Sequence, residues 1–180
     1  MIYHSIAEVF ETIERTHSSF IASVTNLSPG QEDFRPVPDR WTIAEISEHV
    51  GIVNSGFLRL AQTLLKQAEA EPKPPRTNLE FSLQRLTDSG TMKEKWKAPE
   101  RVEPHGGVPV AESTLKNQQA IDQLSALKPR FEAVDLSGPT WDHPFLGPLN
   151  LYETLIVLVI HETKHRHQVE EIKASAGFPA

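Results

Sequence analysis

The sequence contains no cysteine. Disulfide bonds, iron–sulfur clusters, thiolate zinc sites and a cysteine nucleophile are therefore excluded. The longest apolar run, LIVLVI at residues 155–160, has six residues, whereas a helix that spans a bilayer needs about 20. The amino-terminal stretch MIYHSIAEVF has neither a basic segment nor a small-residue cleavage site, so we expect no signal peptide and a cytoplasmic location.

Basic residues are in the minority, since 18 lysines and arginines stand against 24 aspartates and glutamates, for a net charge of −6. Nucleic acids and anionic membranes both bind proteins through a basic face that displaces counterions. We therefore expect neither kind of partner. The length of 180 residues is enough for one domain with a core of its own, and we expect a single domain over residues 1–180.

The sequence also lacks the long apolar–polar alternation of exposed strands, and its apolar residues recur three and four positions apart instead. This spacing predicts four amphipathic helices. We expect them over residues 3–27, from Thr42 to the proline-rich stretch at 68–75, over 111–134 and over 150–175. In the third helix the pattern predicts an inward stripe of Leu115, Ile121, Leu124, Leu127, Phe131 and Val134, and Pro129 should bend or break it.

Capping residues support two of these helix starts. Thr42 and Asn150 each stand three residues before a glutamate, Glu45 and Glu153. That spacing is typical of a capping box, in which each of the two side chains bonds the other residue's backbone N–H.

Residues 71–109 are the least regular part of the chain, with six prolines and the sequence HGG at 105–107. We expect only a short helix here, around 79–88, and a loop at 136–148. Four long amphipathic helices in one domain predict an all-α fold, a four-helix bundle with a long crossover between helices two and three.

Three histidines stand close together in IHETKHRHQ, residues 160–168. Helical residues four apart point the same way, so His161 and His165 share a mostly apolar face, and His167 should point outward. Two inward histidines at this spacing can bind one metal ion. They can equally be hydrogen-bonded core residues or the polar end of a surface helix.

A third ligand should come from a neighbouring helix, because two ligands rarely hold a metal alone. His49 lies on the inward side of the second helix, near Ile46 and Val53. We therefore predict a metal site of His49, His161 and His165.

At these residues the sequence resembles the DinB/YfiT-like superfamily. The resemblance rests on WTIAEISEHVGIVNSGF, on HPFLGPLNLYETLIVLVIHETKHRHQ and on the proline-rich crossover. It implies an all-helical bundle, often dimeric, in which His49, His161 and His165 bind a divalent metal with positions open to water. Some relatives, maleylpyruvate isomerase and bacillithiol S-transferase, use a low-molecular-weight thiol.

The first functional hypothesis is a metal-dependent enzyme that transfers a small thiol to an electrophile or hydrolyses a small molecule. Three neutral imidazoles suit zinc, nickel, iron(II) or cobalt. Glu45 and Glu48 are candidate general bases, although capping is the expected role of Glu45, so the catalytic residue stays unidentified. The alternative is a non-catalytic protein that binds a metal or small ligand, with a possible link to stress, and a third possibility is a metal-free bundle.

Four further polar residues have a structural and a functional interpretation. We expect His17 to be a buried, hydrogen-bonded histidine of the first helix. Gln168, one turn after His165, can hydrogen-bond a ligand or a group that supports one, or simply pack. Asp142 and His143 can line the mouth of a pocket, but DHPF is also typical of a turn, which we expect.

Overall fold

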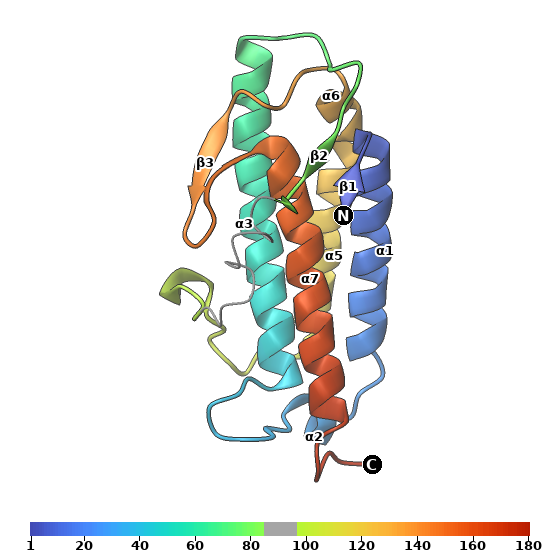
Figure 1. Ribbon diagram of the computed structural model, residues 1–180. Helices are drawn as coiled ribbons and strands as arrows, with labels where there is room; N and C mark the ends of the chain where they lie inside the picture. Colours follow the sequence, from blue (N-terminus) through green and yellow to red (C-terminus); the bar gives the residue numbers. More distant parts are fainter. Residues whose placement is uncertain (85–96) are drawn as a thin grey trace.

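The computed structural model describes residues 1–84 and 97–180, and in these ranges four long helices lie side by side (Figure 1). They are α1 (Ile6–Val24), α3 (Ile43–Ala70), α5 (Val110–Ala126) and α7 (Leu151–Lys173). Shorter helices are α2 (Pro29–Glu32), η2 (Glu100–Val102) and α6 (Lys128–Glu132). The predicted all-α four-helix bundle is confirmed. In the described part of the chain, no helix is both long and apolar enough to cross a membrane.

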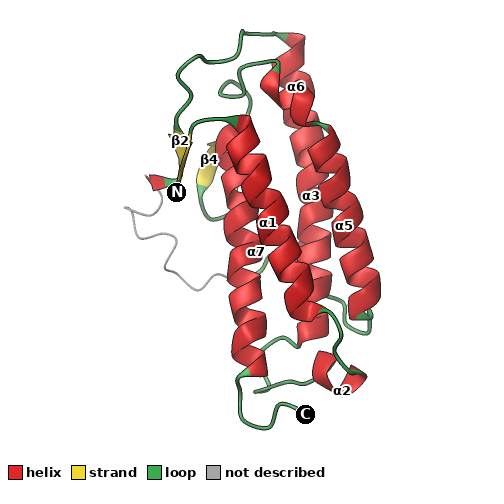
Figure 2. Ribbon diagram, turned by 90° about the vertical axis from the view of Figure 1, so that its right-hand side faces the viewer, coloured by secondary structure: helices red, strands yellow, loops and turns green. Residues whose placement is uncertain are grey.

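The helices pair in parallel, α1 beside α7 and α3 beside α5 (Figures 1 and 2). Because α3 and α5 run in the same direction, the chain must return along the full length of the bundle between them. The crossover predicted between helices two and three makes this return, and η2 belongs to it. A tight turn cannot make this connection.

The capping boxes expected from the sequence are present at both helix starts. The Thr42 hydroxyl accepts from the Glu45 N–H at 3.1 Å, and the Glu45 carboxylate accepts from the Thr42 N–H at 2.8 Å. Asn150 and Glu153 make the same reciprocal pair, each bond at 3.0 Å. These bonds satisfy N–H groups that the first turn of a helix leaves without partners.

One expectation about the connections is wrong, and another is only partly tested. The expected loop at 136–148 contains the antiparallel strands β3 (Thr140–His143) and β4 (Gly147–Asn150). The helix expected around 79–88 is only partly tested: Phe81–Ser82 form β2, which pairs with β1 (Ile2–Tyr3), Gln84 is helical, and residues 85–88 lie outside the described residues. Strands this short leave almost no alternation to read, and their stability comes from pairing with a partner strand.

The third helix breaks at Leu127, two residues before Pro129, as predicted, and α6 continues after it. The prediction that Leu115 points inward is wrong, since its side chain is 59% exposed. Ser113 and Asn117 face the interior in its place. A Cβ atom on Gly51 of α3 would stand 3.2 Å from the Ser113 carbonyl oxygen, so α3 and α5 approach closely where their side chains are small.

The apolar interior is divided into two clusters along the bundle. The large core holds most of the buried residues, among them Phe10, Ile13, Phe57, Leu64, Ile121, Leu155 and Val159. The small core lies nearer α2 and consists mainly of Phe20, Val24, Ile43, Ile46, Val50, Val110, Val169 and Ile172. On every long helix, a buried polar residue separates the two: His17, Asn54, Asn117 and Glu162. We call these four residues the polar layer.

Two leucines of α5 should respond very differently to truncation. Leu124 is 2% exposed, so Leu124→Ala should lower the free energy of unfolding by about 2–5 kcal/mol, because it leaves a cavity in the large core. Leu115→Ala, the matched control, should change it by less than about 0.5 kcal/mol. Urea unfolding measures both, and equal losses would contradict this placement of α5.

Candidate metal centre

The structure brings His49, His161 and His165 together between α3 and α7. The Nε2 atom of His161 lies 3.1 Å from Nε2 of His49 and 3.1 Å from Nε2 of His165. One ligand atom from each of the three lies within 4.8 Å of the others, and among the described residues this is the one such cluster of histidine and carboxylate groups. His167 is exposed and points away, as predicted.

Two of the rings are oriented by acceptors behind them. Nδ1 of His49 lies 2.6 Å from the Val102 carbonyl oxygen, and Nδ1 of His165 lies 2.8 Å from Oε1 of Gln168. An oxygen of either kind only accepts, so each Nδ1 carries the hydrogen and each Nε2 turns a lone pair toward the cluster. This is the tautomer that a metal ligand needs. Of the two interpretations left open for Gln168, hydrogen bonding and packing, the structure shows a hydrogen bond, to His165.

Two of the nitrogen separations fit a shared metal ion, and one ligand nitrogen from each of the three histidines lies within 4.8 Å of the others. Zinc–nitrogen bonds of about 2.0–2.1 Å place tetrahedral ligands about 3.3 Å apart and right-angled ligands about 2.9 Å apart. The two 3.1 Å separations fall between these values. The buried Nδ1 of His161 has no hydrogen-bond partner within residues 1–84 and 97–180, so the ring of His161 is placed by its Nε2 contacts and by packing.

Trp41 and the crossover enclose the cluster. The Trp41 ring lies against those of His49 and His165, with centroids 4.8 Å and 6.4 Å away. The bond from His49 to Val102 holds η2 over the same face of α3. Trp41 thus packs against two of the three histidines.

The electrostatic surroundings keep the three imidazoles neutral. Burial lowers the pKa of His165 to about 3, with a contribution from the nearby His49. Burial likewise lowers the pKa of His49, and it lowers that of His161 well below its ordinary value. The positive charge of Lys164 acts in the same direction on all three. A metal ion needs the neutral imidazole, so no proton has to be removed before it binds at neutral pH.

Both candidate general bases are engaged elsewhere. Glu45 caps α3 and also accepts from Arg35 at 2.7 Å. Glu48 is buried, and its two oxygens accept from the backbone N–H groups of His105 and Gly106 at 3.1 and 3.0 Å. Two adjacent residues of α3 thus have different roles: Glu48 binds the backbone of the crossover, and His49 is part of the histidine cluster.

Two other expectations concern residues near the cluster. His17 is buried and hydrogen-bonded, as predicted, with Glu162 at 3.1 Å and Gln118 at 3.1 Å. His143 belongs to the β3–β4 hairpin, where its Nδ1 accepts from the Phe145 N–H at 3.2 Å, so the expected turn is present. Burial lowers the pKa of His143 to about 4, with help from the positive charge of Arg101.

Sequence reasoning missed Glu162, which follows His161 directly and is only 1% exposed. The available signal was its position: residues 158, 162 and 165 lie on the buried side of α7, whereas charged residues on a helix usually face water. Its partners come from other helices, at sequence distances that no local pattern reveals.

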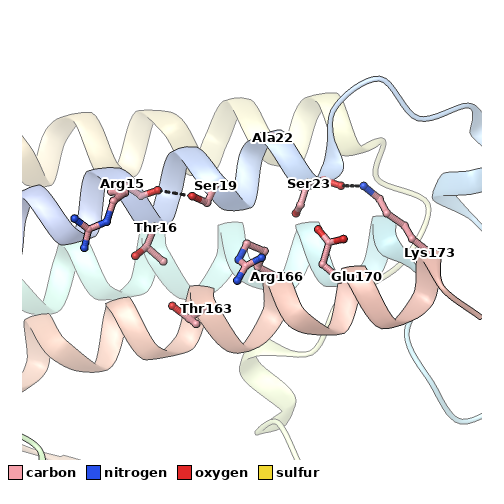
Figure 3. A pocket seen from close by; sticks show the side chains of 9 residues that line it. All are labelled: Arg15, Thr16, Ser19, Ala22, Ser23, Thr163, Arg166, Glu170 and Lys173. Atoms are coloured by element: carbon pink, nitrogen blue, oxygen red, sulfur yellow. Dashed lines mark hydrogen bonds between the residues drawn. The ribbon is translucent and has the colours of Figure 1, made fainter. Parts of the chain in front are cut away.

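The described residues also line a surface groove of about 660 Å³ between α1 and α7 (Figure 3). It contains none of the three histidines. Its walls consist of small or hydroxyl-bearing residues and several charged ones, namely Arg15, Thr16, Ser19, Ala22, Ser23, Thr163, Arg166, Glu170 and Lys173. The histidine cluster and this groove therefore lie on different sides of α7.

Comparison with known proteins gives a family and a fold. The profile of the DinB superfamily matches residues 12–169. Among solved structures, the chain is similar to one described as the crystal structure of TT2238, a four-helix bundle protein, with a TM-score of 0.60 and 18% identity over 93% of this chain and 99% of that one. At that identity the likeness concerns the fold alone. No curated protein matches the chain.

The neutral imidazoles should make the metal-free protein less stable in acid. A histidine with a pKa near 3 when folded, such as His165, and about 6.5 when unfolded takes up its proton first in the unfolded state. The free energy of unfolding should therefore fall as the pH drops below about 6.5, by up to about 1.4 kcal/mol per pH unit for this group.

Urea unfolding between neutral pH and pH about 4.5 measures this slope. His165→Gln should make it shallower, whereas His167→Gln, an exposed position on the same helix, should leave it unchanged. An equal slope in wild type and His165→Gln would contradict the burial of this ring.

Proposed function

This chain belongs to the DinB superfamily, and on that premise we propose that His49, His161 and His165 bind a divalent metal ion and that the protein is a metal-dependent enzyme acting on small molecules. The observation that carries the proposal is that three Nε2 atoms from two helices lie together. In two of the rings, those of His49 and His165, a hydrogen bond at Nδ1 leaves the lone pair of Nε2 facing the cluster. Zinc, nickel, iron(II) and cobalt all suit three imidazoles.

The charge balance of the site favours an anionic ligand at the open positions. Three neutral imidazoles leave the charge of a divalent ion uncompensated. No aspartate or glutamate joins the cluster within the described part of the chain, and the nearby Glu48 is committed to the crossover. A thiolate or a hydroxide would supply the missing negative charge, because an unpaired charge is costly in a partly dry site.

A bound divalent ion supplies Lewis acidity, which lowers the pKa of a water or thiol in its coordination sphere. The chain's own residues orient and enclose the reaction. Val102 and Gln168 hold the rings of His49 and His165, and Trp41 with η2 limits access of water from one side. Either transfer of a low-molecular-weight thiol to an electrophile or hydrolysis of a small molecule is consistent with these parts.

One observation favours the alternative, a non-catalytic protein that binds a metal or a small ligand. Glu45 and Glu48, the two candidate bases beside the cluster, are both bonded to other groups. An enzyme of the proposed kind would then rely on the metal-bound group itself as the base. Activity measurements separate the two functions, because both predict metal binding.

Metal binding is tested with protein purified without a histidine tag. We expect about one equivalent of zinc, nickel or a similar ion by elemental analysis, and tight binding of Co²⁺ with a visible absorption spectrum. His161→Ala should weaken Co²⁺ binding by more than about 100-fold, since losing a direct ligand costs at least as much as losing an outer partner. His167→Ala is the matched control, and equal affinities in the two variants would rule out the proposed ligand set.

Catalysis is tested by incubating the metal-loaded protein with several cellular thiols and an electrophilic substrate. We expect conjugation above the uncatalysed rate in the wild type and its loss in His165→Ala. His167→Ala should keep full turnover. Turnover that survives His165→Ala would show that the reaction does not use this metal, and absence of turnover with intact metal binding would support the non-catalytic alternative.

A further inference from the structure

We propose that Glu162 is a positioning residue, which ties α7 to the other three long helices and thereby aims His161 and His165 at His49. The inference rests on the proposed metal function and goes further, because it assigns a role to a residue that touches none of the three rings in the contacts of the described chain. It concerns the polar layer defined above.

One oxygen of Glu162 contacts a polar side chain from each of the other three long helices. Oε1 faces Nδ1 of His17 on α1 at 3.1 Å, and it accepts from Nδ2 of Asn54 on α3 at 2.6 Å and of Asn117 on α5 at 3.3 Å. Asn54 also donates to Oδ1 of Asn117 at 2.6 Å. The four long helices of the bundle thus meet at a single carboxylate.

The polar layer extends through His17 to a second residue of α5. Nε2 of His17 lies 3.1 Å from Oε1 of Gln118, whose amide nitrogen donates to Asp122 at 2.8 Å. That second bond sets the orientation of the amide, so both ring nitrogens of His17 face acceptor oxygens. His17 therefore links Glu162 on α7 to Gln118 on α5.

The location of the layer explains why polar bonds set the rotation of α7. Glu162 lies between Val159 of the large core and Val169 of the small core, where apolar packing is interrupted. Apolar contacts are non-directional, whereas hydrogen bonds require a particular angle. In this part of the helix the contacts of Glu162 therefore decide which way neighbouring side chains point.

A metal site requires its ligand atoms to be placed more accurately than a small rotation of a helix allows. Side chains reach about 5–6 Å from a helix axis, so a rotation of about 20° moves their ends by about 2 Å. Metal–ligand distances tolerate about 0.2 Å. Because His161 precedes Glu162 and His165 follows it on the next turn, any rotation that breaks the layer also carries both rings away from His49.

A purely stabilising role would be a weaker explanation. Replacing buried polar or charged partners by apolar residues of the same shape is often neutral or favourable for stability, and the best-attested use of such buried groups is to fix one arrangement among several. The polar layer, with one residue on each long helix, is suited to fixing one arrangement of the four helices in this way.

The test compares Glu162→Gln with Glu170→Gln. Both change the same group on α7, but Glu170 is exposed at the groove between α1 and α7 (Figure 3). We expect Glu162→Gln to weaken Co²⁺ binding by about 10–100-fold and to alter the Co²⁺ absorption spectrum, with Glu170→Gln like the wild type. If Glu162→Gln does not fold, His17→Gln removes one partner from α1 and should give a smaller change in the same direction.

A second readout does not depend on metal. In the metal-free protein, diethyl pyrocarbonate should modify His161 and His165 several-fold faster in Glu162→Gln than in Glu170→Gln, as followed by peptide mass spectrometry. If the wild type binds no Co²⁺, the metal function fails and these rates alone decide the positioning role. The positioning role is overturned if Glu162→Gln lowers only the unfolding midpoint and matches Glu170→Gln in Co²⁺ affinity, spectrum and modification rates.

Discussion

The bundle depends on a carboxylate buried where its apolar interior is interrupted. Glu162 would be costly to bury alone, and it is accommodated because α1, α3 and α5 each bring a polar group to the same oxygen. The two apolar cores on either side supply most of the buried apolar surface, but their contacts are compatible with many rotations of a helix about its axis. The hydrogen bonds of the polar layer are compatible with few such rotations, and the histidine cluster lies directly beside this layer.

The parallel pairing of the helices has a second consequence. With α3 and α5 running in one direction, the connection between them must return along the bundle, and η2, which belongs to it, contacts α3. Glu48 and His49 hold this connection at His105, Gly106 and Val102. The topology therefore supplies both an enclosure for the cluster and an acceptor that orients one of its rings.

The cluster is built at the expense of stability. Three partly or fully buried imidazoles crowd together, each held neutral by burial, and the Nδ1 of one of them is buried without a partner among the described residues. Such an arrangement lowers the stability of the metal-free fold in acid, and a bound metal would offset the loss because it binds the folded chain. Residues that break the rules of a well-packed interior in this way are typical of functional sites.

The sequence by itself determined the four long helices, two of their capping boxes, the break near Pro129 and the helix face shared by His161 and His165, because each depends on residues within a few turns of one another. It was wrong about Leu115 and the β3–β4 hairpin, and it overlooked Glu162. Only the tertiary structure decided these, together with the approach of His49, the acceptor role of Val102 and the engagement of Glu48. Each depends on partners far away in the chain, and the free energy of a polar or apolar side chain is set by the neighbours that folding brings to it rather than by its position in a local pattern.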